Sequence, residues 1–290
     1  MRCAHELPEC FIKLQGKEAV ESLFQCHRSW ICQRIKIGSL DDELEVEIRV
    51  WWNEKDRMLK LSIPTAEQQP RFLGQVAYGV QELPMNGDEA VAQKWVAVVG
   101  PQTALTCVND GSYGCDFSED GLRLSLLRSP AYTAHPILDR PLVRQDRFEP
   151  RIDQGERMFR FWINAGEAKE RMKSIDREAL AKNEKPFGMQ MFPERVERVG
   201  GVEGVEGAGL RPFVVLKGEA VQMTAMKLAE DGEDIIIRLF EPTGQKRSVV
   251  LSLPLFGIDK KVTMSPFEIK TLRVDVGKRK VVETDLMEKV

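Results

Sequence analysis

The stretch Glu43-Leu44-Glu45-Val46-Glu47-Ile48-Arg49-Val50 alternates polar and apolar residues without a break. Successive side chains of a β-strand point to opposite faces, so this alternation predicts a strand with one face in water and the other buried. The pattern returns in Met58-Leu59-Lys60-Leu61-Ser62-Ile63 after the polar break Asn53-Glu54-Lys55-Asp56. We therefore expect these two segments to pair as an antiparallel β-hairpin.

Similar strand-like runs occur on both sides, separated by turn signals such as Asn86-Gly87-Asp88 and Asn109-Asp110-Gly111. Helical spacing is confined to residues 172–180, where Ser174 is a candidate N-cap, and residues 17–24 fit either a short helix or a strand. Many short strands with few helices predict an all-β sandwich or barrel. The further runs are Trp30–Ile37, Leu73–Tyr78, Lys94–Val99, Leu105–Val108, Leu122–Leu127 and Arg157–Ile163.

A change of composition divides the chain. Five glycines lie between Val199 and Gly209, interleaved with Val and Glu. This predicts a linker at residues 199–209, with a long loop inside one domain as the alternative. The linker would separate a first domain at residues 1–198 from a small sandwich of immunoglobulin-like size at residues 210–290. The runs of the second domain are Phe213–Lys217, Ala220–Lys227, Asp234–Phe240, Ser248–Leu253 and Phe267–Val276.

The last run and the tail carry two local signals. The apolar residues change from odd to even positions between Ile269 and Leu272, which predicts a β-bulge near Thr271. The residues from Gly277 onward, including Lys278-Arg279-Lys280, are expected to be frayed.

Charge and hydropathy exclude some classes of partner. The chain has 42 Lys and Arg residues against 45 Asp and Glu residues, a formal net charge of -3. This balance gives no long-range field that would attract nucleic acid or an anionic membrane. No run of about 18 apolar residues is present that could span a bilayer. We therefore expect no nucleic-acid partner and no membrane partner.

The cysteines and the first residues indicate a compartment. Six cysteines, at positions 3, 10, 26, 32, 107 and 115, form no C-x-x-C pair, and residues 1–11 lack the apolar region of a signal peptide. We expect reduced thiols and a cytoplasmic location. The alternative is a set of disulfides in an exported fragment.

Five groups of residues follow one another in order between about residues 29 and 276. The most specific group is Asn109-Asp110-Gly111-Ser112-Tyr113-Gly114 followed by Leu122-Arg123-Leu124-Ser125-Leu126-Leu127-Arg128-Ser129-Pro130. Together the groups resemble the C-terminal β-region of glycoside hydrolase family 38 α-mannosidases. The other four are Val50-Trp51-Trp52-Asn53-Glu54 with Met58-Leu59-Lys60-Leu61, Lys94-Trp95-Val96, Asp153-Gln154-Gly155-Glu156 with Phe159-Arg160-Phe161, and Pro266-Phe267-Glu268-Ile269-Lys270-Thr271-Leu272.

This resemblance implies an architecture. In the family, an α/β barrel and a three-helix segment precede a β-supersandwich and a smaller β-sandwich. The resemblance here begins inside the supersandwich. It implies an all-β chain with a partial, galactose-mutarotase-like β-supersandwich at residues 1–198, shortened on its N-terminal side, followed by a small immunoglobulin-like β-sandwich.

The resemblance also implies where the chemistry lies. The family cleaves α-mannosides with retention, using an Asp nucleophile, an acid/base carboxylate and a zinc ion, mostly on the barrel. None of His5, His27 and His135 is followed two residues later by Asp, the family's ligand pair. We therefore expect no catalytic residue and no metal ligand in this chain, and zinc in the catalytic half. The expected partners are an α-mannoside or another carbohydrate, and a catalytic barrel domain or chain without which this chain is inactive.

Three residues are candidates for the sugar cleft. Leu122, Leu124 and Leu126 share one strand face, and Arg128 falls on the same face if the strand continues, where a charge needs a partner or a polar cleft. The resemblance implies that this Arg approaches the sugar, and the alternative is that it caps the turn before Pro130. Asp110 is first a turn residue, which the resemblance places near the catalytic domain. Tyr113 either stacks on a sugar or fills a hairpin.

Neighbouring tryptophans give a further expectation. Trp51 and Trp52 are adjacent in a predicted strand, so one must be buried and the other exposed. An exposed Trp binds sugar by stacking or packs against another domain. Trp162, in an apolar run, is expected in the core.

Three functions follow from these observations. The first is the β-region of an α-mannosidase, which shapes the cleft and supports the barrel. The second is a non-catalytic carbohydrate-binding β-sandwich, which differs from the first in having measurable affinity for mannose or mannobiose on its own. The third is a mutarotase, for which only His27 or His135 could serve as the acid/base group, and fold alone does not assign that chemistry.

Overall fold

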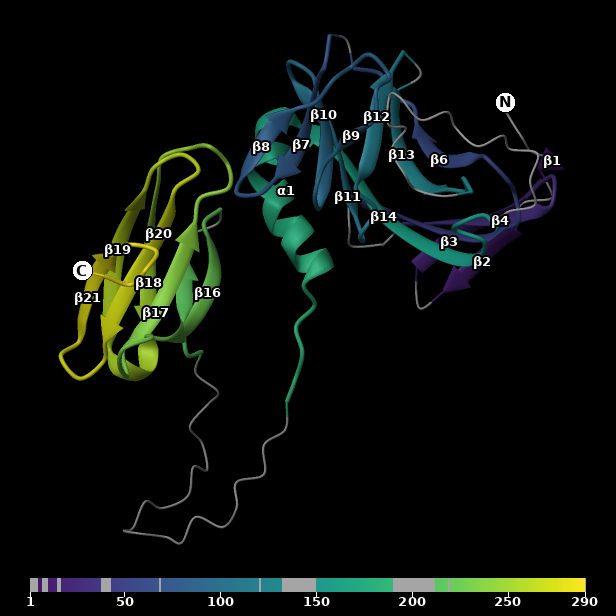
Figure 1. The fold of residues 1–290 in the computed structure, drawn as a ribbon. Coiled ribbons are helices and arrows are strands. Elements are labelled where there is room, and N and C mark those ends of the chain that lie inside the picture. Colours follow the sequence, from purple (N-terminus) through teal and green to yellow (C-terminus); the bar gives the residue numbers. More distant parts are fainter. Residues whose placement is uncertain are drawn as a thin grey trace, which may run out of the picture. The chain divides into compact units, whose positions relative to one another are not determined.

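The structure, a computed structural model, describes residues 5–6, 10–14, 17–37, 43–67, 69–119, 121–131, 150–189, 212–218 and 220–289, with the backbone alone up to residue 18. The chain divides into two compact units, Met1–Asn183 and Glu184–Val290. Both are built almost wholly of antiparallel strands, so the predicted all-β class is confirmed (Figure 1). The expected linker at residues 199–209 lies outside the described residues.

The first unit is a sandwich of two antiparallel sheets. The larger has ten strands in the order β1-β3-β4-β5-β14-β11-β10-β7-β8, with β2 paired to β3, and the smaller has four in the order β6-β13-β12-β9. The large sheet contains β1 (His5–Glu6), β2 (Cys10–Leu14), β3 (Lys17–Cys26), β4 (Ser29–Ile37), β5 (Glu43–Trp52), β7 (Arg71–Val76), β8 (Gly79–Glu82), β10 (Trp95–Val99), β11 (Thr103–Asn109) and β14 (Gly155–Glu167). The small sheet contains β6 (Met58–Ile63), β9 (Ala90–Val91), β12 (Gly114–Ser118) and β13 (Gly121–Arg128).

The core of this unit lies between the two sheets. The even-numbered apolar residues of β5, from Val46 to Trp52, point inward, as their alternation predicts. They meet Phe72 and Phe161 of the same sheet and the leucines of β13 from the facing sheet. Each such buried side chain contributes about 1.5–3 kcal/mol by leaving water. The inward faces therefore hold the two sheets together.

The expected hairpin between residues 43–50 and residues 58–63 is wrong. β5 pairs with β4 and β14, whereas β6 pairs with β13 in the other sheet. The polar segment 53–57 carries the chain from one sheet to the other, and the apolar faces of β5 and β6 then meet across the core. Alternation fixes which face of a strand is buried, but it does not fix the hydrogen-bonded neighbour.

One helix, α1 (Ala168–Asn183), packs on β10, β11 and β14 of the large sheet, on the face turned away from the sandwich core. Its Ile175 and Ala179 are fully buried against Trp95 and Trp162. The expected N-cap at Ser174 is wrong because the helix already begins at Ala168. Residues 17–24, which fitted a helix or a strand, belong to β3.

The second unit is a smaller sandwich of a three-stranded and a four-stranded sheet. Ile237, Leu239, Leu251 and Leu253 are fully buried between them. Two of its strands, β19 and β21, were not predicted from the sequence. The first sheet contains β15 (Val215–Lys217), β18 (Arg247–Leu253) and β19 (Ile258–Met264), and the second contains β16 (Gln222–Leu228), β17 (Ile235–Phe240), β20 (Ile269–Asp275) and β21 (Lys280–Thr284), with a 3-10 turn at Pro254–Phe256.

Two local predictions for this unit are wrong. The register between β17 and β20 runs without a shift from Ile269 to Val274, because Phe267 precedes the strand in a turn with φ 56. The tail was expected to be frayed from Gly277, but residues 280–284 form β21, which pairs with β20, and its Val281 packs on the core.

Candidate functional site

The three predicted cleft residues lie where β11, β12 and β13 begin or end at one end of the first unit. β11 ends at Asn109, and the loop that follows carries Asp110 and Tyr113 from the large sheet to β12 of the small sheet. β13 runs antiparallel to β12 and ends at Arg128. Among the described residues, no hydrogen bond or ion pair joins the three side chains to one another. They are separate groups on the loops of one sandwich end.

The prediction that Arg128 shares the leucine face is wrong. A register shift between Ser125 and Leu127 places Leu127 in the core, 6% exposed, in the position that strict alternation would give to Leu126. The β-bulge turns Arg128 outward, and its side chain is exposed. Within the described part of the chain, the Arg128 guanidinium has no acceptor. An exposed Arg with five donors can bind the hydroxyl or anionic groups of a ligand.

The loop with Asp110 is organised by its neighbour Asn109, which the sequence pattern indicated only as a turn residue. The Asn109 side chain is 4% exposed, and its Oδ1 accepts hydrogen bonds from the amides of Gly111 at 3.1 Å and Ser112 at 3.2 Å. Its Nδ2 donates to the Gln93 carbonyl at 2.7 Å. These bonds fix the turn and leave the Asp110 carboxylate exposed on it.

Helix α1 also stabilises the loop that follows Asn109. Asn183, the last helical residue, donates to the Asn109 carbonyl at 3.0 Å. The helix is itself anchored to the sheet, since Asp176 accepts hydrogen bonds from the Trp95 indole at 2.9 Å and the Gln75 amide at 2.8 Å. The loop is therefore held by the sheet, the helix and its own turn.

Tyr113 stands on the same loop with 54% of its surface exposed. Its backbone carbonyl accepts a hydrogen bond from the Ala92 amide at 3.0 Å, which fixes the backbone beside β9. Tyr113 is therefore not part of the hydrophobic core. An exposed ring on a fixed backbone is suited to stacking.

The buried carboxylates of this unit are structural. Asp116 is fully buried on β12 and pairs with Lys60 and Arg123. Although burial lowers the pKa of Lys60, hydrogen bonds to Asp116 and Glu89 raise it above its usual value. Glu54 is 7% exposed and accepts hydrogen bonds from the Arg28 amide and the Ser29 hydroxyl. These carboxylates act as acceptors inside the fold.

The described residues offer neither a thiol suited to act as a nucleophile nor a group of metal ligands. Cys26, Cys32, Cys107 and Cys115 form no disulfide among the described residues, and burial raises the pKa of the Cys115 thiol to about 12 and that of Cys107 further. Among the side chains that the structure describes, no group of three or more His, Cys, Asp and Glu residues could hold a metal ion. His27 lies in the exposed β3–β4 turn, and His135 and the His5 side chain are outside the described residues.

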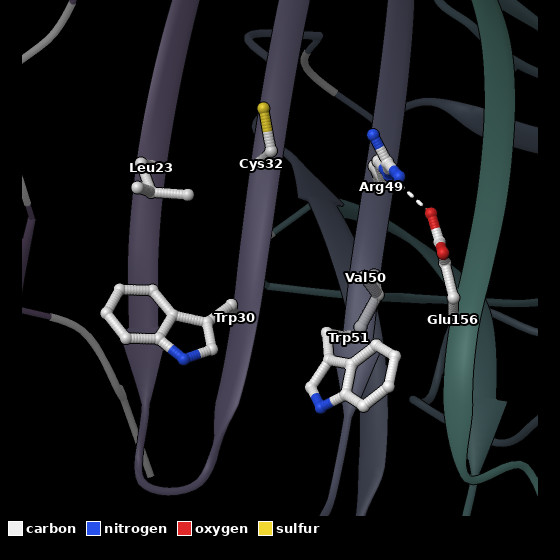
Figure 2. A pocket seen from close by; sticks show the side chains of 7 residues that line it. All are labelled: Leu23, Trp30, Cys32, Arg49, Val50, Trp51 and Glu156. Atoms are coloured by element: carbon white, nitrogen blue, oxygen red, sulfur yellow. Dashed lines mark hydrogen bonds and ion pairs between the residues drawn. The ribbon is translucent and has the colours of Figure 1, made fainter.

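A second surface feature lies on the outer face of the large sheet. A shallow hollow of about 190 Å³ is lined by residues of β3, β4, β5 and β14 (Figure 2). Trp51 is 56% exposed there, whereas Trp52 is 2% exposed in the core, so the prediction for this pair is confirmed. Trp162 is 7% exposed, as expected of a core residue. The lining residues are Leu23, Trp30, Cys32, Arg49, Val50, Trp51 and Glu156.

The two units of the chain are two successive antiparallel β-sandwiches. Comparison with known families assigns both sandwiches to one family. The family described as glycosyl hydrolases family 38 C-terminal domain matches residues 6–141, and the one described as glycosyl hydrolases family 38 C-terminal beta sandwich domain matches residues 220–290. The chain belongs to the C-terminal region of glycosyl hydrolase family 38, as its motifs indicated.

Individual relatives agree with this assignment. Alpha-mannosidase G of Dictyostelium discoideum is 22% identical in an alignment of 261 residues, and the match covers 79% of this chain and 22% of that protein. The structure of a family 38 protein from Enterococcus faecalis has a TM-score of 0.70 at 16% identity, over 94% of this chain and 36% of that one. An α-mannosidase structure from Enterococcus faecalis V583 has a TM-score of 0.70 at 15% identity, over 94% and 35%. The chain thus spans about a fifth to a third of the length of these proteins, and the structures show its fold.

Proposed function

We propose that this chain is the C-terminal β-region of a retaining α-mannosidase, which supports a catalytic barrel and contributes loop residues to the sugar cleft. Both sandwiches match the C-terminal domains of family 38 in the family's order, and a relative carries the name of an α-mannosidase. The observation that carries the proposal is the β-bulge of β13. It turns the Arg128 guanidinium out of the core, without an acceptor among the described residues, at the sandwich end that also bears Asp110 and Tyr113.

The three residues have distinct roles in this proposal. Arg128 donates hydrogen bonds to sugar hydroxyls and stabilises negative charge near the leaving oxygen. Tyr113 stacks its exposed ring on a pyranose. Asp110 contacts the barrel, and the turn held by Asn109 keeps it in place. None of the three touches the reacting bond as nucleophile or acid in this proposal.

The reacting carboxylates belong to the barrel. Retaining hydrolysis needs two carboxyl groups roughly 5 Å apart across the sugar. The buried carboxylates described above are held by protein donors, and the donor set of the described residues does not fit a metal ion. We therefore assign the nucleophile, the acid/base group and the zinc ion to the catalytic half. In this proposal, no step of the reaction uses zinc held by this chain.

The ligand and the surroundings are part of the same proposal. The ligand is an α-mannoside or another neutral carbohydrate, and the macromolecular partner is a catalytic barrel, as a domain or as a separate chain. None of the described helices is long and apolar enough to cross a membrane. The scattered thiols support a cytoplasmic location. The small net charge supports the absence of a nucleic-acid or membrane partner, and the family match supports a role in mannose metabolism.

The test compares the chain with and without its barrel on an aryl α-mannoside. Residues 1–290 alone, with zinc added, are expected to show no turnover. In the assembled enzyme, Arg128→Ala is expected to lower kcat/KM by at least tenfold, because a charged donor to the substrate is lost. Arg177→Ala, at an exposed arginine on α1, is the matched control and leaves kcat/KM unchanged. Zinc-dependent turnover by the chain alone, or equal effects of the two variants, would contradict the proposal.

A further inference from the structure

The outer face of the large sheet is divided into zones. Helix α1 covers it over β10, β11 and part of β14. β3, β4 and the first half of β14 lie outside this contact, and so does β5 apart from its first residue Glu43, which pairs with Lys182 of α1. Their outward side chains form a charged zone and, further along the strands, an aromatic zone.

The charged zone is neutralised within itself. The strand register places Glu21, Arg34, Glu47 and Arg160 side by side in one row across four strands. Arg34 pairs with Glu21 at 2.7 Å and with Glu47 at 3.0 Å. The adjacent row continues the pattern, since Lys36 pairs with Glu45 at 3.2 Å. Alternating charges in direct contact leave no net field for a charged ligand.

The aromatic zone follows from the same register. Trp30 of β4 lies directly opposite Trp51 of β5, and Glu156 of β14 lies opposite Trp51 on its other side. Trp30 is 41% and Trp51 is 56% exposed. Figure 2 shows the two indole rings side by side against the sheet, with the Arg49–Glu156 ion pair beside Trp51. The next row adds the partly apolar border of Leu23 and Cys32.

We propose that this surface, which we name the tryptophan platform (Trp30, Trp51, Arg49 and Glu156), binds a neutral oligosaccharide. The exposed faces of the two indoles stack on the C–H faces of two sugar rings. The Arg49 guanidinium donates to hydroxyl oxygens, and the Glu156 carboxylate accepts hydrogen bonds from hydroxyl groups. Both side chains can do so because both are exposed to solvent in their ion pair. The platform shares no residue with the proposed mannosidase cleft, although the Arg128 amide donates to Asp153, three residues before Glu156.

Three observations favour a sugar over a protein partner. A stable protein interface covers about 800 Å² on each side, whereas this hollow is lined by seven residues and bordered by self-neutralised charges. The two indoles are presented by the neighbouring strands β4 and β5, which pair in continuous register with each other and with β3, so the surface is ordered before a ligand arrives. Flat aromatic faces beside paired donors and acceptors match the mixed C–H and hydroxyl faces of a pyranose chain.

The experiment titrates residues 1–290 with α-1,6-mannohexaose, β-1,4-mannohexaose, cellohexaose and mannose by calorimetry. At least one hexaose is expected to bind at least tenfold more tightly than mannose, because two rings must stack together. Trp51→Ala and Trp30→Ala are each expected to weaken that binding at least tenfold, and Trp51→Phe less. Glu156→Gln is expected to weaken it several-fold. The thermal unfolding of each variant shows whether the fold is kept.

Tyr113→Ala is the matched control, since it removes an exposed ring at the cleft candidate and should leave the hexaose affinity unchanged. Binding lost in Tyr113→Ala and kept in Trp51→Ala would place the sugar at the loops and overturn the platform, while the mannosidase proposal stands. Absence of binding to all three hexaoses would also overturn it. So would self-association in sedimentation equilibrium that Trp51→Ala abolishes without any sugar affinity, because the platform would then be an interface between copies of the chain.

Discussion

Trp51 and Trp52 are consecutive on β5, yet they point through opposite faces of the large sheet, Trp51 to the outer hollow and Trp52 into the sandwich core. The same bulky side chain therefore has different energetic roles at neighbouring positions. Trp52→Ala is expected to lower the free energy of unfolding by about 3–5 kcal/mol, since it leaves a cavity between the sheets. Trp51→Ala is expected to lower it by less than about 1 kcal/mol. Urea unfolding measures both, and a similar loss in the two variants would contradict the assignment of faces.

Asn109 holds the loop of the proposed cleft by three side-chain hydrogen bonds. Asn109→Ala leaves two loop amides and the Gln93 carbonyl without this partner. We expect a loss of about 1–3 kcal/mol in stability, because the site is buried. Amide hydrogen exchange should show faster exchange at Gly111 and Ser112 with little change in the second unit. Asp110→Ala, one residue along, is the control and should have almost no effect on either measurement.

The sequence predicted the faces of strands better than their partners. The alternation in residues 43–50 identified their buried side correctly, and adjacency alone placed Trp51 and Trp52 on opposite faces. The predicted partner of β5 was wrong because a polar crossing segment and a hairpin turn look alike in sequence. Pairing of β5 with β14 joins residues about a hundred positions apart, and no local pattern carries that information.

The candidate site shows the same limit. Arg128, Asp110 and Tyr113 were named from motif resemblance, and their exposure agrees with a surface role. The argument that put Arg128 on the leucine face failed because a single-residue bulge in β13 reverses the parity. The tryptophan platform was not predicted, since Trp30 and Trp51 become neighbours only through the β4–β5 register. Bulges and non-local register are tertiary properties, so only the structure reveals them.

Glu47 links stability to pH. Burial raises the pKa of this carboxyl, but hydrogen bonding to Lys36 and the charges of Lys36, Arg34 and Arg160 outweigh it and hold the pKa below its ordinary value of 4.5. Its stabilising contribution is therefore complete above about pH 4.5 and is lost as the pH falls through the lowered folded-state pKa. Glu47→Gln should lower stability at pH 7 and reduce the further loss on acidification. Urea unfolding at a series of pH values between about 3 and 7 measures this, and an unchanged pH profile in the variant would contradict it.

Gly121 begins β13 with φ 103, a conformation that other residues rarely adopt. A Cβ at this position would lie 2.6 Å from the Ile63 carbonyl oxygen of β6. Gly121→Ala is therefore expected to destabilise the first unit by about 1–3 kcal/mol or more, since backbone strain and a clash with a paired strand act together. Gly111→Ala also has a positive φ but meets no atom within 4 Å, so it should cost less. Equal losses in the two variants would show that the close approach to β6 does not matter.

Glu241 tests whether the second unit unfolds on its own. Its carboxylate is fully buried and accepts hydrogen bonds from the amides of Thr243 at 3.0 Å, Gln245 at 3.1 Å and Phe267 at 3.2 Å. Glu241→Ala removes a buried carboxylate that accepts from three partly buried amides and should destabilise this unit by about 1–3 kcal/mol. All five tryptophans lie within residues 1–183, so tryptophan fluorescence follows the first unit alone. The variant should lower the midpoint of the circular dichroism transition of the second unit and leave the fluorescence transition in place. A matching shift of the fluorescence transition would mean that the two units unfold together.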